Sequence, residues 1–150
     1  MKTAAQWIED LELARHSEGG WFRRVYESEL TFDGSRPAMT SIYYLLEGDD
    51  FSAFHKLKSD EQWHFYTGSP ITIHEIDRSG KYESPTLGQG RFQHTVRAGN
   101  LFGATVEGDF ALVGCTVVPG FDFSDFDLPP RGELLQAYPQ YSDLILRLTR

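Results

Sequence analysis

A histidine and a glutamate six residues apart are the side chains of this sequence best suited to chemistry. His55 and Glu61 lie on either side of Ser59-Asp60, a pair typical of a tight turn between two strands. Because side chains alternate between the two faces of a strand, His55 and Leu57 share one face and two lysines share the other. Lysines favour solvent, so we expect His55 to point inward. An imidazole and a carboxylate on one inner face can exchange protons with a bound molecule or hold a metal ion.

The elements that must position this pair are predominantly β-strands. Segments rich in β-branched and aromatic residues alternate with turns that contain Gly, Asn, Asp and Pro. Short strands at regular spacing with such turns predict an antiparallel sandwich or barrel, so the expected fold class is all-β. The predicted strands cover residues 21–28, 39–46, 51–57, 61–66, 71–76, 82–87, 101–106 and 110–118.

Short helices are expected at both ends of the β region. Thr3 and Gln6 have the spacing of a capping box, and apolar residues at helical spacing follow, which predicts a helix that ends near residues 15–16. Two further short helices, split by Pro139, are predicted over residues 134–138 and 141–148. With 150 residues and no visible linker or repeat, the sequence predicts one domain over residues 1–150.

Charge and cysteine content narrow the functional classes. The formal net charge is -8, and the longest basic run is the pair Arg23-Arg24, which argues against a nucleic-acid-binding protein. Cys115 is the only cysteine, so no disulfide can form within the chain. No segment approaches the length of apolar sequence that a membrane helix needs. We therefore expect a cytoplasmic protein without membrane association.

The segment from His55 to Gly68 resembles the first motif of the cupin superfamily, in which a His-x-His pair is followed by a glutamate and then a glycine. His55, Glu61 and Gly68 match this motif, whereas Leu57 replaces the second histidine. In the counterpart of the second motif, Phe102 replaces a third metal-binding histidine. The resemblance implies a jelly-roll barrel with two of four metal ligands absent. We therefore predict no cofactor, with a divalent metal at His55 and Glu61 as the alternative.

Four blocks of sequence, residues 16–23, 40–46, 59–68 and 114–123, resemble the cupin-5 subfamily, whose members are described as sugar-epimerase-like. This resemblance implies a small, carbohydrate-like ligand in the cup of the barrel. The dTDP-sugar 3,5-epimerases share the barrel and use a histidine as base without a metal. By that likeness His55 would remove a proton beside a carbonyl and Glu61 would orient the imidazole. Tyr44 or Tyr66 would return the proton.

Further residues are predicted to contact the ligand. Arg23 carries a planar guanidinium that can hold an anionic group. Alternation places His64 on the face opposite Glu61 unless a bulge intervenes. An apolar, aromatic cup with a few polar groups is typical of small-molecule sites. The predicted ligand-binding residues are Glu18, Arg23, Leu57, Trp63, His64 and Phe102. The residues interpreted as structural are His16, His74, His94 and Cys115.

Two other functions stay open from the sequence. One is a non-catalytic binding protein whose aromatic cup stacks a planar ligand, with His55 and Glu61 fixing its orientation. The other is a metal-dependent cupin enzyme, which Leu57 and Phe102 disfavour. In every case the expected partner is a small molecule. We also expect a homodimer, because the long strand at residues 21–28 offers an edge that must be covered.

Overall fold

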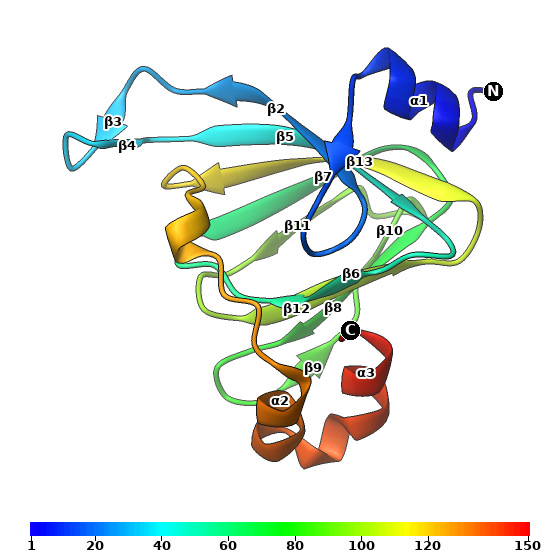
Figure 1. Ribbon diagram of the computed structural model, residues 1–150, viewed down its shortest axis with the longest axis vertical. Coiled ribbons are helices and arrows are strands. Elements are labelled where there is room, and N and C mark those ends of the chain that lie inside the picture. The colour runs from blue at the N-terminus through cyan, green and yellow to red at the C-terminus, as the bar shows by residue number, and fades with distance from the viewer.

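Two antiparallel β-sheets face each other and enclose a layer of apolar side chains (Figure 1). The structure is a computed structural model that describes all 150 residues. The first sheet has six strands in the order β1-β2-β5-β13-β7-β11. Their bounds are β1 Ala14–Arg15, β2 Trp21–Glu27, β5 Thr40–Glu47, β13 Phe110–Val118, β7 Asp60–Gly68 and β11 Gln93–Val96.

The second sheet has the strand order β10-β8-β12-β6, and β9 also pairs with β8. Its strands are β10 Thr86–Leu87, β8 Ile71–Ile76, β12 Leu101–Val106, β6 Ser52–His55 and β9 Tyr82–Glu83. A separate hairpin projects beyond the ends of β2 and β5 (Figure 1). It consists of β3 Thr31–Phe32 and β4 Arg36–Pro37.

Short helices lie outside the two sheets. In Figure 1 the N-terminal helix lies beyond the first sheet and the C-terminal helices lie beyond the second. No helix of the fold has the length and apolar character that crossing a membrane demands. The helices are α1 Ala4–Asp10, η1 Phe123–Asp125, α2 Arg131–Ala137, η2 Pro139–Tyr141 and α3 Ser142–Arg147.

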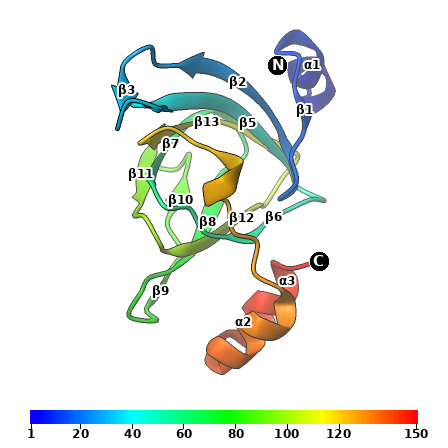
Figure 2. The ribbon, with the colours of Figure 1, turned by 60° about the vertical axis from the view of Figure 1, so that its left-hand side comes forward.

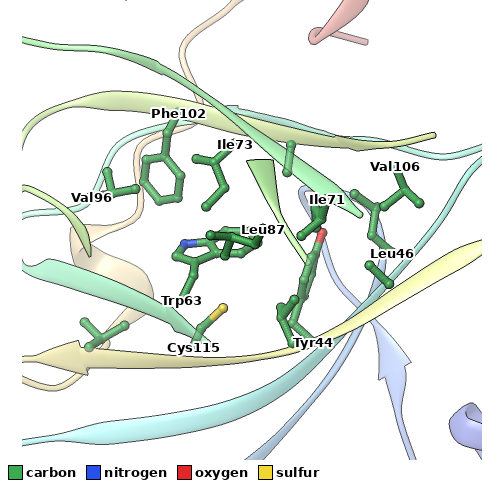
Figure 3. Close-up of a cluster of buried hydrophobic side chains, with 14 of the residues drawn as sticks. Tyr44, Leu46, Trp63, Ile71, Ile73, Leu87, Val96, Phe102, Val106 and Cys115 are labelled. Atoms are coloured by element: carbon green, nitrogen blue, oxygen red, sulfur yellow. The ribbon is translucent and has the colours of Figure 1, made fainter. Parts of the chain in front are cut away.

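The main core consists of side chains that alternate inward along strands of both sheets. Tyr44, Trp63 and Cys115 rise from the first sheet and face Ile73 and Phe102 of the second (Figure 3). All five are buried, and Trp63 and Phe102 meet edge-on with ring centroids 6.4 Å apart. This inward alternation is the period of two that the strand patterns predicted.

The helices cover apolar residues that alternate outward from the same strands. Phe54 and Leu101, on the outer face of the second sheet, pack with Leu134, Ile145 and Leu148 of the C-terminal region. The other face of the first sheet is covered by α1, which contributes side chains to a cluster around Leu13, Leu45, Phe110 and Leu112. Both sheets are therefore buried on the inner face and partly covered outside.

The all-β class with short terminal helices is confirmed, with three local corrections. The first helix ends at Asp10, because Glu12 takes a left-handed φ of 52° and the next residues pair with β2. The predicted strand at 82–87 is interrupted before Pro85, which has no N–H for a ladder. Strand β11 was missed, because only Val96 of its four residues is buried and its pairing with β7 defines it.

Truncating Phe54 tests how strongly the C-terminal helices hold the second sheet. Its side chain is fully buried, so Phe54→Ala should lower the free energy of unfolding by about 3–5 kcal/mol. Phe92→Ala, which removes a ring that is 55% exposed, should cost less than about 1 kcal/mol. Urea denaturation of both variants measures the difference, and equal losses would contradict the assignment of Phe54 to a packed core.

The homodimer stays a prediction, and the unpaired part of β2 supports it. Strand β1 pairs only with Trp21 and Phe22, so the outer edge from Arg23 to Glu27 has no strand beside it. These five residues are exposed. Light scattering at micromolar concentration should give twice the mass of one chain, and the mass of a single chain would contradict the prediction.

Candidate functional site

A cavity of about 350 Å³ opens at the end of the barrel where β5 and β7 begin and β13 ends. The segment that follows β13 lies across this opening (Figure 2) and contributes three phenylalanines to the wall. The aromatic lining residues are Phe22, Tyr44, Trp63, Phe121, Phe123 and Phe126. The ionisable lining groups are His16, Glu18, Arg24, His55, Glu61 and Asp122, with Tyr44 and Cys115 among the weaker acids.

The central polar contact of the cavity joins His55 to Glu18. His55 Nε2 lies 2.9 Å from Glu18 Oε2, and both side chains are almost fully buried. On the other side of the ring, His55 Nδ1 lies 2.7 Å from the carbonyl oxygen of Ala53. A carbonyl oxygen can only accept, so Nδ1 carries a hydrogen and Nε2 shares a proton with the carboxylate.

The charges of this pair follow from competition between burial and attraction. Burial by itself would lower the pKa of His55, but the adjacent Glu18 carboxylate, together with Glu61 and the Ala53 carbonyl, raises that pKa above its ordinary value. Burial would likewise raise the pKa of Glu18, yet His55 lowers it below its ordinary value. Both shifts favour the ion pair of an imidazolium and a carboxylate. Both ring nitrogens of His55 are occupied, and neither has a free lone pair.

Two glycines allow Glu18 to reach the cavity from the loop between β1 and β2. Gly19 and Gly20 have φ values of 109° and 76°, in the left-handed region that residues with a Cβ rarely adopt. A Cβ on Gly19 would collide with the carbonyl oxygen of Phe51, and one on Gly20 would lie 2.5 Å from the Tyr44 hydroxyl oxygen. The loop thus packs closely against β5 and the start of β6.

The backbone of Glu18 is also fixed from two directions. Its carbonyl oxygen accepts a hydrogen bond of 2.8 Å from the Ala53 N–H and another of 2.8 Å from Arg150 Nη1. Arg150 Nη2 also donates to Asp50, whose carboxylate accepts from the Gly20 N–H. The last residue of the chain therefore holds the loop that carries the buried carboxylate.

Glu61 differs from Glu18 because it has no fixed partner. Burial and the negative charge of Glu18 raise the pKa of Glu61 to about 7, and His55 offsets only part of this rise. The Trp63 indole lies beside Glu61 and favours the ionised form, yet its buried N–H meets no acceptor in hydrogen-bond geometry. Near neutral pH, Glu61 is the group in the cavity most able to gain and lose a proton.

Most of the predicted site residues on inner faces do line the cavity. Glu18, Tyr44, Leu57 and Trp63 are among its lining residues together with His55 and Glu61. Phe102 is buried against the His55 ring, with centroids 4.1 Å apart, but does not itself line the cavity. The expectation that Glu61 orients His55 is corrected, because Glu18 makes that contact.

Besides Phe102, three predicted residues do not line the cavity. Arg23 pairs with Glu12 through contacts of 2.6 Å, and the Tyr66 side chain is 53% exposed. His64 is absent from the lining as well, since it alternates outward between two inward residues of β7. These placements give no support to the ligand contacts expected of Arg23 and His64 or to the proton return expected of Tyr66.

Several residues that line the cavity were not predicted from the sequence, and His16 and Arg24 are two of them. Arg24 shares a strand face with Phe22, so alternation carried a usable signal. It donates a 3.1 Å hydrogen bond to the carbonyl oxygen of Phe121 at the cavity mouth. His16 was interpreted as structural because it lies in a loop, where no strand or helix period predicts its direction.

The donor set does not match the metal site of the cupin motif. Leu57 and Phe102 supply carbon where that motif has histidines, and His55 is already engaged on both nitrogens. No group of three or more His, Cys, Asp or Glu side chains in the structure is arranged to hold a metal ion.

Glu61→Gln should remove a pH-dependent loss of stability. A pKa of about 7 in the folded chain lies above the ordinary 4.5, so the stability that Glu61 contributes is present below about pH 4.5 and lost as pH rises through about 7. As pH rises from about 4.5 to above about 7, the free energy of unfolding of the natural chain should fall by about 3 kcal/mol relative to that of Glu61→Gln. Urea unfolding at several pH values measures the difference. The exposed control Glu107→Gln should not change the pH dependence, and parallel curves for Glu61→Gln would contradict the assignment.

Comparisons with known proteins agree with this architecture. A crystal structure of a protein from Shewanella oneidensis superimposes with a TM-score of 0.96 at 42% identity, covering 100% of this chain and 99% of that one. A hypothetical protein from Leishmania major gives a TM-score of 0.92 at 32% identity, covering 99% of each chain. A search of curated proteins finds no match.

More distant structures share the fold alone. Oxalate decarboxylase of Bacillus subtilis superimposes with a TM-score of 0.62 at 17% identity, covering 89% of this chain and 36% of that one.

The sequence profile described as "Cupin superfamily (DUF985)" matches residues 5–129. The expected cupin barrel is thereby confirmed, and the chain belongs to the DUF985 family of the cupin superfamily.

Proposed function

We propose that the protein binds a small, carbohydrate-like molecule in the barrel cavity and isomerises it, with Glu61 as the proton acceptor. The observation that carries this proposal is a buried carboxyl group with a pKa of about 7 and no fixed partner, on the wall of an otherwise aromatic cavity. A general base is most effective when its pKa lies near the working pH.

The sequence predicted His55 as the base, and we assign this role to Glu61 because of the contacts that His55 makes. His55 donates to Ala53 and shares its other proton with Glu18, so its ring offers no lone pair to a substrate. Its positive charge instead lies close enough to Glu61 to favour the ionised carboxylate. In this proposal His55 and Glu18 are a fixed ion pair that sets the potential around the base.

The size and lining of the cavity support a small ligand with both apolar and polar faces. A volume of about 350 Å³ lies at the lower end of the range typical of small-molecule sites. Trp63 and Phe126 contribute apolar ring atoms to the wall, and Arg24 and Glu61 contribute groups that bind oxygen functions. Sugars and related hydroxy-ketones combine both kinds of surface.

The tyrosines favour isomerisation by one base over epimerisation by two opposed groups. Tyr66 lies outside the cavity, and the Tyr44 hydroxyl donates to the carbonyl oxygen of Gly19 at 2.7 Å. Burial raises the pKa of Tyr44 well above its ordinary value, which makes the phenol a poor acid. A single carboxylate can remove a proton from the carbon beside the carbonyl and return it, on the same face, to the former carbonyl carbon.

Deuterium exchange in D₂O tests the proposal. With dihydroxyacetone, D-xylulose and D-fructose as probes, at least one should incorporate deuterium beside its carbonyl when the protein is present, as followed by proton NMR. Glu61→Gln should slow this exchange by at least about 100-fold, because an amide cannot accept the proton. Glu107→Gln should leave it unchanged.

The alternative functions give different results in the same experiment. A probe that raises the melting temperature without exchanging would favour a non-catalytic binding protein. Exchange at the natural rate in Glu61→Gln would remove Glu61 as the base.

A further inference from the structure

We infer that His16 is a neutral hydrogen-bond donor that holds the carbonyl oxygen of the substrate, so that the ligand class is a hydroxy-ketone or hydroxy-aldehyde. This inference rests on the proposed function, since it assigns the second polar contact that proton removal beside a carbonyl requires. His16 lines the same cavity as Glu61.

The tautomer of His16 is set by the backbone of its neighbour. The N–H of Glu18 donates a hydrogen bond of 3.1 Å to His16 Nδ1, so Nδ1 must present a lone pair. In a neutral imidazole the hydrogen then lies on Nε2. Nε2 makes no hydrogen bond within the chain, and it is not among the fully enclosed polar atoms.

Its surroundings keep this imidazole neutral. Burial lowers the pKa of His16, and the nearby positive charge of His55 lowers it further, while Glu18 raises it by less than burial lowers it. Of the other ionisable residues that line the cavity, Tyr44 meets the His16 ring edge-on at 6.2 Å and stays uncharged. A second proton on the ring would also have to occupy Nδ1, where the Glu18 N–H already points.

Aromatic contacts fix the direction of the ring. Phe22 meets it edge-on with centroids 4.6 Å apart, and Phe126 meets it edge-on at 6.0 Å. A donor held by apolar neighbours, with no acceptor within the chain, needs an oxygen from a ligand or from solvent in the cavity to take its hydrogen. That condition distinguishes His16 from a histidine that only fills space.

The proton transfer balances with these two groups alone. Glu61 forms an O–H bond as the C–H bond beside the carbonyl breaks, and the released electron pair forms a carbon–carbon double bond. The carbonyl π pair moves onto oxygen, which accepts a hydrogen bond from His16 Nε2–H. This bond strengthens as negative charge develops, so it lowers the barrier more than it tightens substrate binding. Return of the proton from Glu61 to the same carbon gives exchange alone. For isomerisation, the hydroxyl hydrogen on that carbon passes to the enolate oxygen, a new carbonyl forms there, and Glu61 returns its proton to the former carbonyl carbon, which restores Glu61 and leaves His16 unchanged.

Matched variants separate this role from packing. His16→Phe keeps an aromatic ring but removes the donor, and should slow deuterium exchange of the reactive keto probe by about 100- to 1000-fold. His16→Gln restores an N–H and should recover part of that rate. His64→Phe removes a histidine outside the cavity and should leave the rate unchanged.

The tautomer is measured independently by nitrogen-15 NMR of protein labelled at histidine. At neutral pH His16 should show a protonated Nε2 and an unprotonated Nδ1. A charged ring or a hydrogen on Nδ1 would overturn the inference whatever the activity. Slow exchange in Glu61→Gln with a natural rate in His16→Phe would overturn the role of His16 alone. Absence of exchange by the natural protein with every keto probe would remove both proposals.

Discussion

A buried ion pair between Glu18 and His55 is the interaction on which the rest of the site depends. Moving either charge into an apolar barrel is unfavourable unless the other compensates it. The pair must therefore be held closely, and several features serve that need. Gly19 and Gly20 let the loop approach the second sheet, while Ala53 and Arg150 fix the carbonyl of Glu18.

The same pair determines the properties of its neighbours. Because Glu18 satisfies His55, Glu61 is left as a second carboxylate in the same cavity, and repulsion with burial raises its pKa to about 7. The backbone N–H of Glu18 points at His16 and selects its tautomer. Glu18 therefore affects three groups of the cavity: it pairs with His55, raises the pKa of Glu61 and accounts for the tautomer of His16. Leu57 and Phe102 add buried apolar carbon around the pair.

The sequence predicted most strands because turns and alternation are local properties. The inward direction of His55 followed from lysines on the opposite face, and the inward direction of Trp63 followed from the same period. Where pairing rather than composition defines a strand, prediction failed. Strand β11 has polar residues at three of its four positions and exists through its ladder with β7. The first helix ended early because the backbone at Glu12 reverses for packing against β2.

The sequence by itself determined the all-β barrel, the inward faces of its strands and the presence of His55 and Glu61 inside. Only the tertiary structure decided which carboxylate His55 meets and that His16 joins the cavity. Glu18 reaches His55 from the loop beside the first sheet, across the gap to β6 of the second. Side chains of two facing sheets are not paired by a backbone hydrogen-bond register, so the sequence does not show which of them meet. The loop that carries Glu18 contains left-handed glycines and no repeating side-chain direction that a sequence pattern could reveal. Their geometry therefore emerges only when both sheets close around one core.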